Sequence, residues 1–166
     1  AISSLLFQLP PEAFAAAGDV DSTVEINDTT TNGPTLANAD HFGTSVANIG
    51  DLDGDGVNDL AVGASHDDYD GGEDRGAVHI MFMNTDGSVD STVEIGQGRN
   101  NGPIIAPDDL FGYSVANIGD LNGDGVNDLA VGAPRDDAPA IGQHYADHGI
   151  VHIMFMNTDG SVDSTV

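Results

Sequence analysis

The sequence predicts an all-β fold built from two similar four-stranded antiparallel units, and three observations support this prediction. Residues 46–64 and 115–133 share one sequence apart from Asp53 in the first copy and Asn122 in the second. The sequence VHIMFMNTDGSVDSTV occurs unchanged at 78–93 and 151–166. Between these blocks the apolar residues form short runs with strand periodicity, and no segment beyond the N-terminus has a helical period. A tandem repeat of β-units follows from these patterns.

The N-terminal extension, residues 1–18, belongs to neither repeat. Within it, Pro11 predicts the start of a short helix over Glu12–Ala17 that ends at Gly18, because proline suits the first helical position and glycine the end. We interpret the extension as a capping or docking segment. The remaining chain divides into a first repeat with its preceding outer strand, residues 19–95, and a second repeat, residues 96–166.

Four strands are expected in each repeat. The sequence VDSTVEI, at 20–26 and 89–95, alternates apolar and polar residues and predicts a half-buried outer strand. The other expected strands are 44–49 and 113–118, 60–64 and 129–133, and 78–83 and 151–156. Residues 60–64 and 129–133 are nearly all apolar, which predicts burial on both faces. The Asp-Gly turn that follows 78–83 favours a hairpin to the closing strand.

Both faces of the strand at 78–83 are also expected to be packed. Val78, Ile80 and Phe82 alternate with His79, Met81 and Met83, and alternate residues of a strand point to opposite faces. His79 and its counterpart His152 are therefore interpreted as packing or hydrogen-bonding residues, and the methionines as residues that pack one unit on the next.

The charge of the chain restricts its partners. There are 28 acidic residues against three arginines and no lysine, which gives a formal net charge of −25 at pH 7. Such a surface repels nucleic-acid phosphates and anionic lipids and attracts divalent cations. No apolar run approaches the length of a membrane span. We therefore expect no nucleic-acid partner and no membrane insertion. The chain has no cysteine, so it cannot form disulfides, and a bound metal ion is the expected way to stabilise a small domain.

Two acidic loops are the candidate metal sites. Each places carboxylate or amide side chains at positions 1, 3, 5 and 9, with glycines at positions 4 and 6 that allow tight wrapping. Calcium takes six to eight oxygen ligands in flexible geometry, so the loops predict two Ca²⁺ per chain. The predicted ligands are Asp51, Asp53, Asp55, the Val57 carbonyl and Asp59 in the first loop, and Asp120, Asn122, Asp124, the Val126 carbonyl and Asp128 in the second.

An EF-hand is the main alternative for these loops, and it is rejected. It needs a glutamate at position 12 and a helix on each side, whereas position 12 is Val62 or Val131 and the flanks are strand-like. The bidentate role is therefore assigned to Asp59 and Asp128. Magnesium competes poorly because it demands stricter octahedral geometry. The other acidic pairs, Asp67-Asp68 and Asp136-Asp137, are interpreted as solvated loop residues.

These residues resemble the FG-GAP repeats of integrin α-subunit β-propellers and of related bacterial or archaeal surface proteins. Phe42-Gly43 and Phe111-Gly112 match the FG element, and Gly132-Ala133-Pro134 matches the GAP element. The first copy departs from GAP, with Gly63-Ala64-Ser65. The resemblance implies two four-stranded propeller-like blades, each with Ca²⁺ in the loop between its first two strands.

The function expected from this resemblance is that of an extracellular, calcium-binding structural or adhesion module at the cell surface. Known propellers close with about four to eight blades, so two blades predict a homo-oligomeric ring or an open filament, held by blade packing and strand exchange. A surface glycan or protein ligand is a further candidate partner. An enzyme is not expected, because no nucleophile elbow, cysteine–histidine pair or phosphate loop is found. The alternatives are a lectin-like propeller module that binds carbohydrate or protein, and a non-catalytic part of a larger secreted enzyme.

Overall fold

The computed structural model describes residues 20, 22–68, 74–137 and 148–165. The N-terminal extension, with the helix expected over Glu12–Ala17, lies outside the described residues. Within the described residues the secondary structure consists of strands and turns, arranged as two four-stranded antiparallel sheets. The predicted fold class, all-β with two propeller-like blades, is confirmed.

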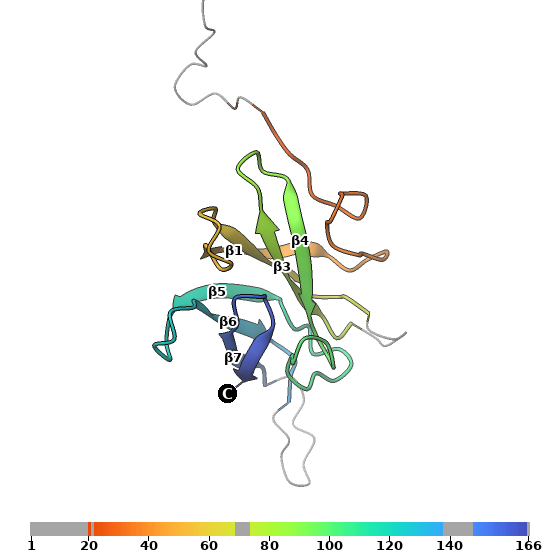
Figure 1. Ribbon diagram of the computed structural model, residues 1–166. Helices are drawn as coiled ribbons and strands as arrows, with labels where there is room; N and C mark the ends of the chain where they lie inside the picture. The colour runs from red at the N-terminus through yellow and green to blue at the C-terminus, as the bar shows by residue number, and fades with distance from the viewer. Residues whose placement is uncertain (1–19, 21, 69–73, 138–147, 166) are drawn as a thin grey trace, which may run out of the picture.

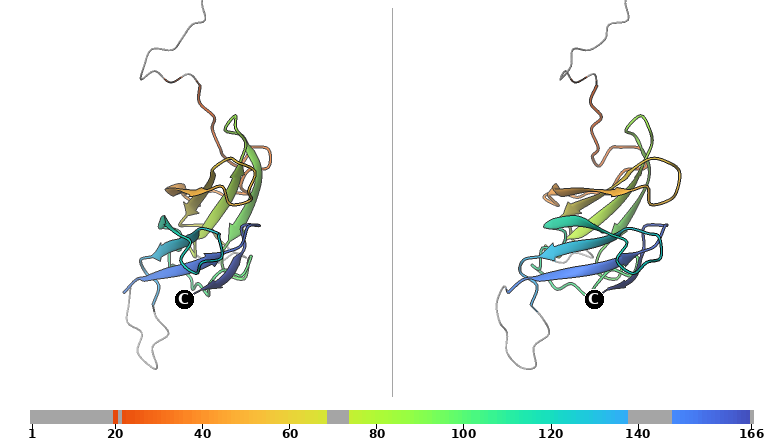
Figure 2. Two further views of the ribbon diagram at one scale, coloured as in Figure 1. Left: turned by 60° about the vertical axis from the view of Figure 1, so that its left-hand side comes forward. Right: turned by 90° about the vertical axis from the view of Figure 1, so that its left-hand side faces the viewer.

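Each sheet follows the chain order without a crossover, so each repeat forms one blade (Figure 1). The first blade contains β1 (Phe42–Gly50), β2 (Asp59–Ala64), β3 (Ala77–Met83) and β4 (Val89–Ile95). The second contains β5 (Ser114–Gly119), β6 (Asp128–Ala133), β7 (Ile150–Met156) and β8 (Val162–Thr165). The two sheets lie one over the other, face to face, as Figure 2 shows from the side.

The central strands of the first blade are buried on both faces, as the apolar runs predict, whereas β6 and β7 of the second blade are fully buried on one face only. Every residue of β3 is buried. Val78, Ile80 and Phe82 belong to the core that the two blades share, whereas Met81 and Met83 belong to a separate core on the other face of the first sheet. Burial of a side chain of this size contributes about 1.5–3 kcal/mol, so packing on two sides stabilises a sheet of such short strands.

The core between the blades joins two different faces. The first blade contributes its valine, isoleucine and phenylalanine face, and the second contributes the methionine face that bears Met154 and Met156. The opposite face of the second blade has no such cover among the described residues. Val151 is 61% exposed, although its counterpart Val78 is fully buried. The order of the blades, and not the local sequence, therefore decides which copy of the same strand is covered.

The prediction of an outer strand at residues 20–26 is wrong. Residue 20 and residues 22–26 form no strand, whereas the same sequence at 89–95 forms β4. The reason is the partner: β4 forms its ladder with β3 from Val78 to Met83, and within the described residues no third strand lies beside the first copy. A strand without a neighbouring ladder is not stable. Ile26 instead packs against the methionine core of the first blade.

Candidate metal centre

The first acidic loop connects β1 to β2, the first two strands of its blade. It leaves β1 at Gly50 and enters β2 at Asp59. Gly54 and Gly56 have φ angles of 83° and 93°, and their counterparts Gly123 and Gly125 have the same values. Only glycine adopts this left-handed conformation at no steric cost. The glycines therefore let both loops wrap in the same way.

Three of the predicted ligands come together in the first loop. One carboxylate oxygen each of Asp51, Asp53 and Asp59 lies within 4.8 Å of the others. Asp55 does not belong to this group, and its Oδ1 accepts a hydrogen bond from the Val57 amide at 2.7 Å. Asp51 accepts bonds from the amides of Gly54 and Gly56, at 2.8 and 2.9 Å, which hold its carboxylate over the loop. The group is a set of hard oxygen donors, as calcium requires.

Asp59 anchors this group from inside the blade. Its side chain is 1% exposed. Its Oδ2 accepts a hydrogen bond from the Leu52 amide at 2.8 Å, and its Oδ1 accepts one from the Met83 amide at 3.0 Å. Each oxygen keeps a second lone pair for a cation. Burial raises the pKa of Asp59, and the charges of Asp53 and Asp55 raise it further. A bound cation opposes both effects.

The second loop repeats the anchor and differs at the third position. Asp128 is fully buried and accepts bonds from the amides of Leu121 and Met156, at 2.8 and 3.1 Å. Asn122 donates from its Nδ2 to Asp124 Oδ2 at 2.7 Å. Among the described residues, the carboxylates of this loop form no group of three like that of the first loop. Because Asn122 stands where the first loop has Asp53, the donor set of the second loop carries one negative charge fewer.

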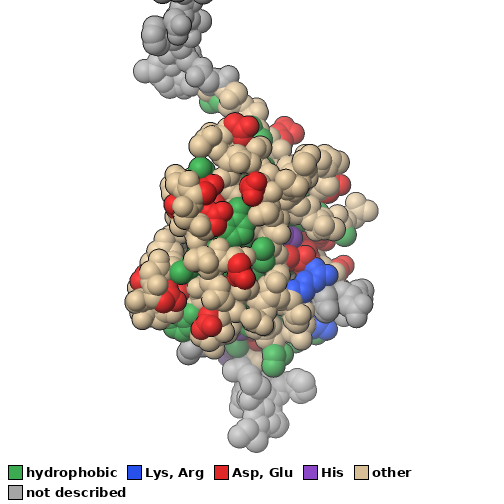
Figure 3. Space-filling model, viewed as in Figure 1, with side chains coloured by type: hydrophobic (Ala, Val, Ile, Leu, Met, Phe, Trp, Pro, Cys, Tyr) green, Lys and Arg blue, Asp and Glu red, His purple; other side chains and the backbone are tan. Residues whose placement is uncertain are grey.

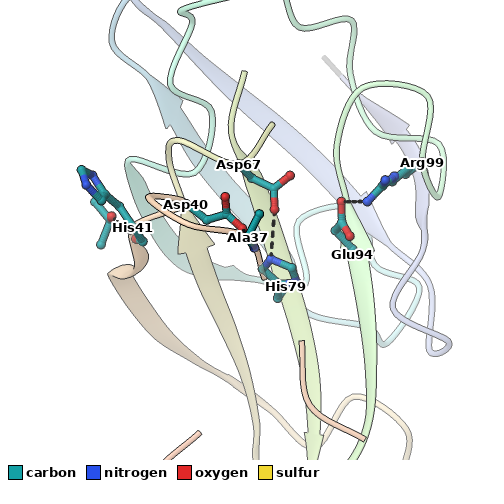
Figure 4. A network of polar contacts seen from close by, with 8 residues as sticks. Ala37, Asp40, His41, Asp67, His79, Glu94 and Arg99 are labelled. Carbon is teal, nitrogen blue, oxygen red and sulfur yellow. Dashed lines mark hydrogen bonds and ion pairs between the residues drawn. The ribbon is translucent and has the colours of Figure 1, made fainter. Parts of the chain in front are cut away.

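Buried aspartate–histidine pairs are the polar feature that the sequence interpretation missed. Asp67 and Asp136 were expected in solvent, and this expectation is wrong: they are 7% and 6% exposed. Asp67 Oδ2 lies 3.8 Å from His79 Nε2, as Figure 4 shows, and Asp136 Oδ2 lies 2.8 Å from His152 Nε2. The recurrence of aspartate and histidine at matching places in both repeats was the signal for them.

A third carboxylate lies beside each pair, and its environment makes folding sensitive to pH. Burial raises the pKa of Asp40, and repulsion from Asp67 and Asp68 adds to it. Burial likewise raises the pKa of Asp109, with repulsion from Asp136 and Asp137. Asp40 and Asp109 each accept a backbone hydrogen bond, from Ala37 and Ala106, and this contact partly offsets the effect of burial.

We expect Asp40→Asn and Asp109→Asn to make the free energy of unfolding less dependent on pH. Below the ordinary pKa of 3.8 these groups are protonated in both states and contribute nothing. As the pH rises from there through the raised pKa of the folded state, the folded chain binds more protons than the unfolded chain, so stability falls. Urea unfolding between pH 4 and 7 measures this. A steeper decline in the variants would contradict it.

The fold and the loops agree with comparisons to known proteins. The family model described as "FG-GAP repeat" matches residues 42–81 and 111–154. Human integrin alpha-6 is 41% identical over 111 residues, which cover 67% of this chain and 9% of that protein. Integrin alpha-PS2 of Drosophila melanogaster is 36% identical over 116 residues, 66% of this chain and 8% of that protein. Integrin alpha-5 of Xenopus laevis is 41% identical over 112 residues, 67% of this chain and 10% of that protein.

The matched residues contain the FG pair and the acidic loop of each repeat. Each match begins at the phenylalanine of an FG pair, Phe42 or Phe111, and continues through the acidic loop into the third strand of a blade. The chain spans about a tenth of the length of these integrin relatives. Since the family model covers both repeats in order, the chain belongs to the FG-GAP repeat family.

Proposed function

We propose that this chain is a calcium-binding, non-enzymatic adhesion or structural module of the extracellular surface, with two FG-GAP propeller blades. The observation that carries the proposal is the convergence of Asp51, Asp53 and Asp59 in the loop between β1 and β2. The same anchor and glycine conformations recur in the second loop. Ca²⁺ at both loops would neutralise carboxylates that have no basic residue beside them in sequence.

The proposed surface location and ligand class of this chain are based on its relatives and on its charge. Integrin alpha chains are the relatives that the sequence matches, and they motivate a surface location and a protein or glycan ligand. Acidic side chains are spread over the visible face in Figure 3, whereas basic ones gather at one side. No helix among the described residues has the length and hydropathy to cross a bilayer. We retain the division into an extension (1–18) and two repeats (19–95 and 96–166) as part of the proposal.

Self-assembly is the second part of the proposed function. The second blade exposes the face that the first blade buries against its neighbour. An exposed apolar sheet face of this kind is a site for association. We propose that the chain forms a homo-oligomer or filament through blade packing and strand exchange.

Calorimetry tests the metal proposal. We expect two Ca²⁺ per chain, with dissociation constants that reach the range of extracellular modules, about 10⁻⁴–10⁻³ M. Binding to the folded chain alone should raise the melting temperature with calcium concentration. The absence of calcium uptake, or a melting temperature that does not respond to chelator, would overturn the proposal.

Exchanging the third loop position provides a matched control. The first loop has Asp53 where the second has Asn122, and the rest of the two loops is the same. We expect the first loop to bind more tightly because its donors carry one more charge. Asp53→Asn should make the two affinities similar, and Asn122→Asp should strengthen the second. If the affinities do not follow the charge at this position, the assigned ligands are wrong.

A further inference from the structure

Two histidine side chains meet in the first repeat, at the opposite end of the β1–β2 pair from the acidic loop. The imidazole rings of His41 and His66 have centroids 4.1 Å apart and are tilted by 58°. His41 directly precedes β1, and His66 follows β2 by two residues. Figure 4 shows His41 to one side of Asp40, Asp67 and His79. The two rings are therefore separate from the buried aspartate–histidine pair.

The rings belong to a cluster of side chains that is particular to the first repeat. Residues 40–66 and 109–135 align without a gap and differ at five positions. One of these is the third position of the acidic loop, Asp53 or Asn122. The other four contact one another, and they are His41, Thr44, Ser65 and His66 in the places of Leu110, Tyr113, Pro134 and Arg135. Outside the acidic loop, this stretch of the two repeats thus differs in a single cluster.

Three hydrogen bonds connect the four residues and determine where the protons lie. The His41 carbonyl can only accept, so the Thr44 hydroxyl donates to it, at 2.5 Å. A hydroxyl has one hydrogen, so Thr44 Oγ1 accepts from the Ser65 hydroxyl at 3.3 Å. Ser65 Oγ then accepts from His66 Nδ1 at 3.0 Å. In the neutral ring of His66 the hydrogen is therefore on Nδ1, and Nε2 is the acceptor nitrogen.

The backbone holds the two rings beside each other. The His66 amide donates to the Asp40 carbonyl at 3.1 Å, which ties the loop after β2 to the residue before His41. The Thr44 amide donates to the His41 carbonyl, also at 3.1 Å. The second repeat makes the same two bonds, from Arg135 to Asp109 and from Tyr113 to Leu110. The rings therefore stand on a backbone frame that forms without histidines, and side chains on such a frame are preorganised.

The spacing of the rings suits one shared metal ion. Two imidazoles on one tetrahedral Zn²⁺ have centroids about 5 Å apart, because each Zn–N bond is about 2.0–2.1 Å long. The observed 4.1 Å is slightly shorter, and a small rotation of either side chain opens it. A histidine ligand normally donates its other ring N–H to an oxygen, which fixes the tautomer and the orientation of the ring. Ser65 Oγ is that oxygen for His66.

The donor atoms select a different ion from that of the acidic loops. Imidazole nitrogen suits Zn²⁺, Ni²⁺ and Cu²⁺, whereas Ca²⁺ takes oxygen ligands. The net charge of −25 concentrates divalent cations around the chain. With two ligands from the protein, water would fill the remaining positions around the ion.

We propose that His41 and His66 form a second kind of metal site, particular to the first repeat, which binds one Zn²⁺ or a similar divalent transition-metal ion through two imidazole nitrogens. Ser65 and Thr44 are positioning residues that orient the ring of His66. This inference goes beyond the proposed function and does not depend on calcium binding.

Titration calorimetry with Zn²⁺ in excess Ca²⁺ is the experiment. We expect one Zn²⁺ to bind per wild-type chain, and His41→Leu and His66→Arg each to leave only weak binding by carboxylates. The second repeat has leucine and arginine at these places, and Leu110 has a φ angle of 59° there, so the backbone accepts both residues. Ser65→Ala should weaken binding by about tenfold, because the Nδ1 hydrogen loses its acceptor.

His148→Gln is the matched control. The side chain of His148 is 63% exposed and lies outside the cluster, so this variant should bind Zn²⁺ like the wild type. In Cu²⁺-loaded protein, the hyperfine structure in electron paramagnetic resonance should show two imidazole nitrogens for the wild type and for His148→Gln. Each variant of the pair should show one or none, which distinguishes a pair of ligands from two rings that only pack.

The other outcomes overturn the proposal. Zinc uptake retained in either variant of the pair, or lost in His148→Gln, would place the ion elsewhere. A wild-type chain that takes up no Zn²⁺ would reduce the two rings to a packing contact. Calcium uptake without zinc uptake would reject this inference alone, whereas zinc uptake without calcium uptake would reject only the calcium proposal.

Discussion

Asp59→Ala should lower the free energy of unfolding in calcium by about 2–6 kcal/mol, because it leaves two buried amides without an acceptor at about 1–3 kcal/mol each. These are the amides of Leu52 and Met83, which join the acidic loop to the end of β3. The substitution also removes a carboxylate from the group formed with Asp51 and Asp53. With chelator present the loss should be smaller, since removing a charge also relieves repulsion within the loop.

Urea unfolding with calcium and with chelator measures this effect. Asp53→Ala is the matched control, because Asp53 is exposed and, among the residues that the structure describes, its carboxylate accepts a hydrogen bond only from the nearby Asp55 amide. We expect this variant to lose the stabilisation by calcium at its loop but to match the wild type in chelator. A loss of stability in Asp53→Ala as large as in Asp59→Ala would show that the buried anchor has no special role.

The two sheets and their loops could be predicted because the same strand and loop patterns occur in both repeats of the sequence. The alternation in Val78–Met83 identifies two packed faces, and the structure confirms both. The glycines of the acidic loops mark positions that need positive φ, and their φ angles agree between copies. In these segments the signal is local: strand period, turn chemistry and loop spacing are each determined by neighbouring residues.

Features that depend on a distant partner could not be predicted in this way. Residues 20–26 and 89–95 have one sequence, but residue 20 and residues 22–26 form no strand, because among the described residues only the second copy lies beside a third strand. Val78 and Val151 also occupy identical sequences and differ from fully buried to 61% exposed. Asp67 was assigned to solvent from its acidic neighbours, yet it lies beside His79, which is distant in sequence. Burial and pairing are properties of the assembled blades.

The junction between the blades provides a second large expected effect. Gly63 and Gly132 occupy the same sequence, Val-Gly-Ala, in β2 and β6. A Cβ on Gly63 would lie 1.9 Å from the carbonyl oxygen of Gly112, in the other blade. Among the described residues, a Cβ on Gly132 would come close only to Ser114 Oγ, at 2.3 Å, and its next neighbour is 3.7 Å away. A hydroxyl group can rotate away, whereas a backbone carbonyl inside a packed junction cannot move alone.

Gly63→Ala should therefore lower the free energy of unfolding by about 3 kcal/mol, the upper part of the range for overpacked cores, and Gly132→Ala by less than about 1 kcal/mol. Both substitutions are to be measured by urea unfolding in calcium, at the same protein concentration. Intrinsic strand propensity is the same at both positions, so it cancels in the comparison. Equal losses would mean that the carbonyl of Gly112 is not held against Gly63 at the junction of the two blades.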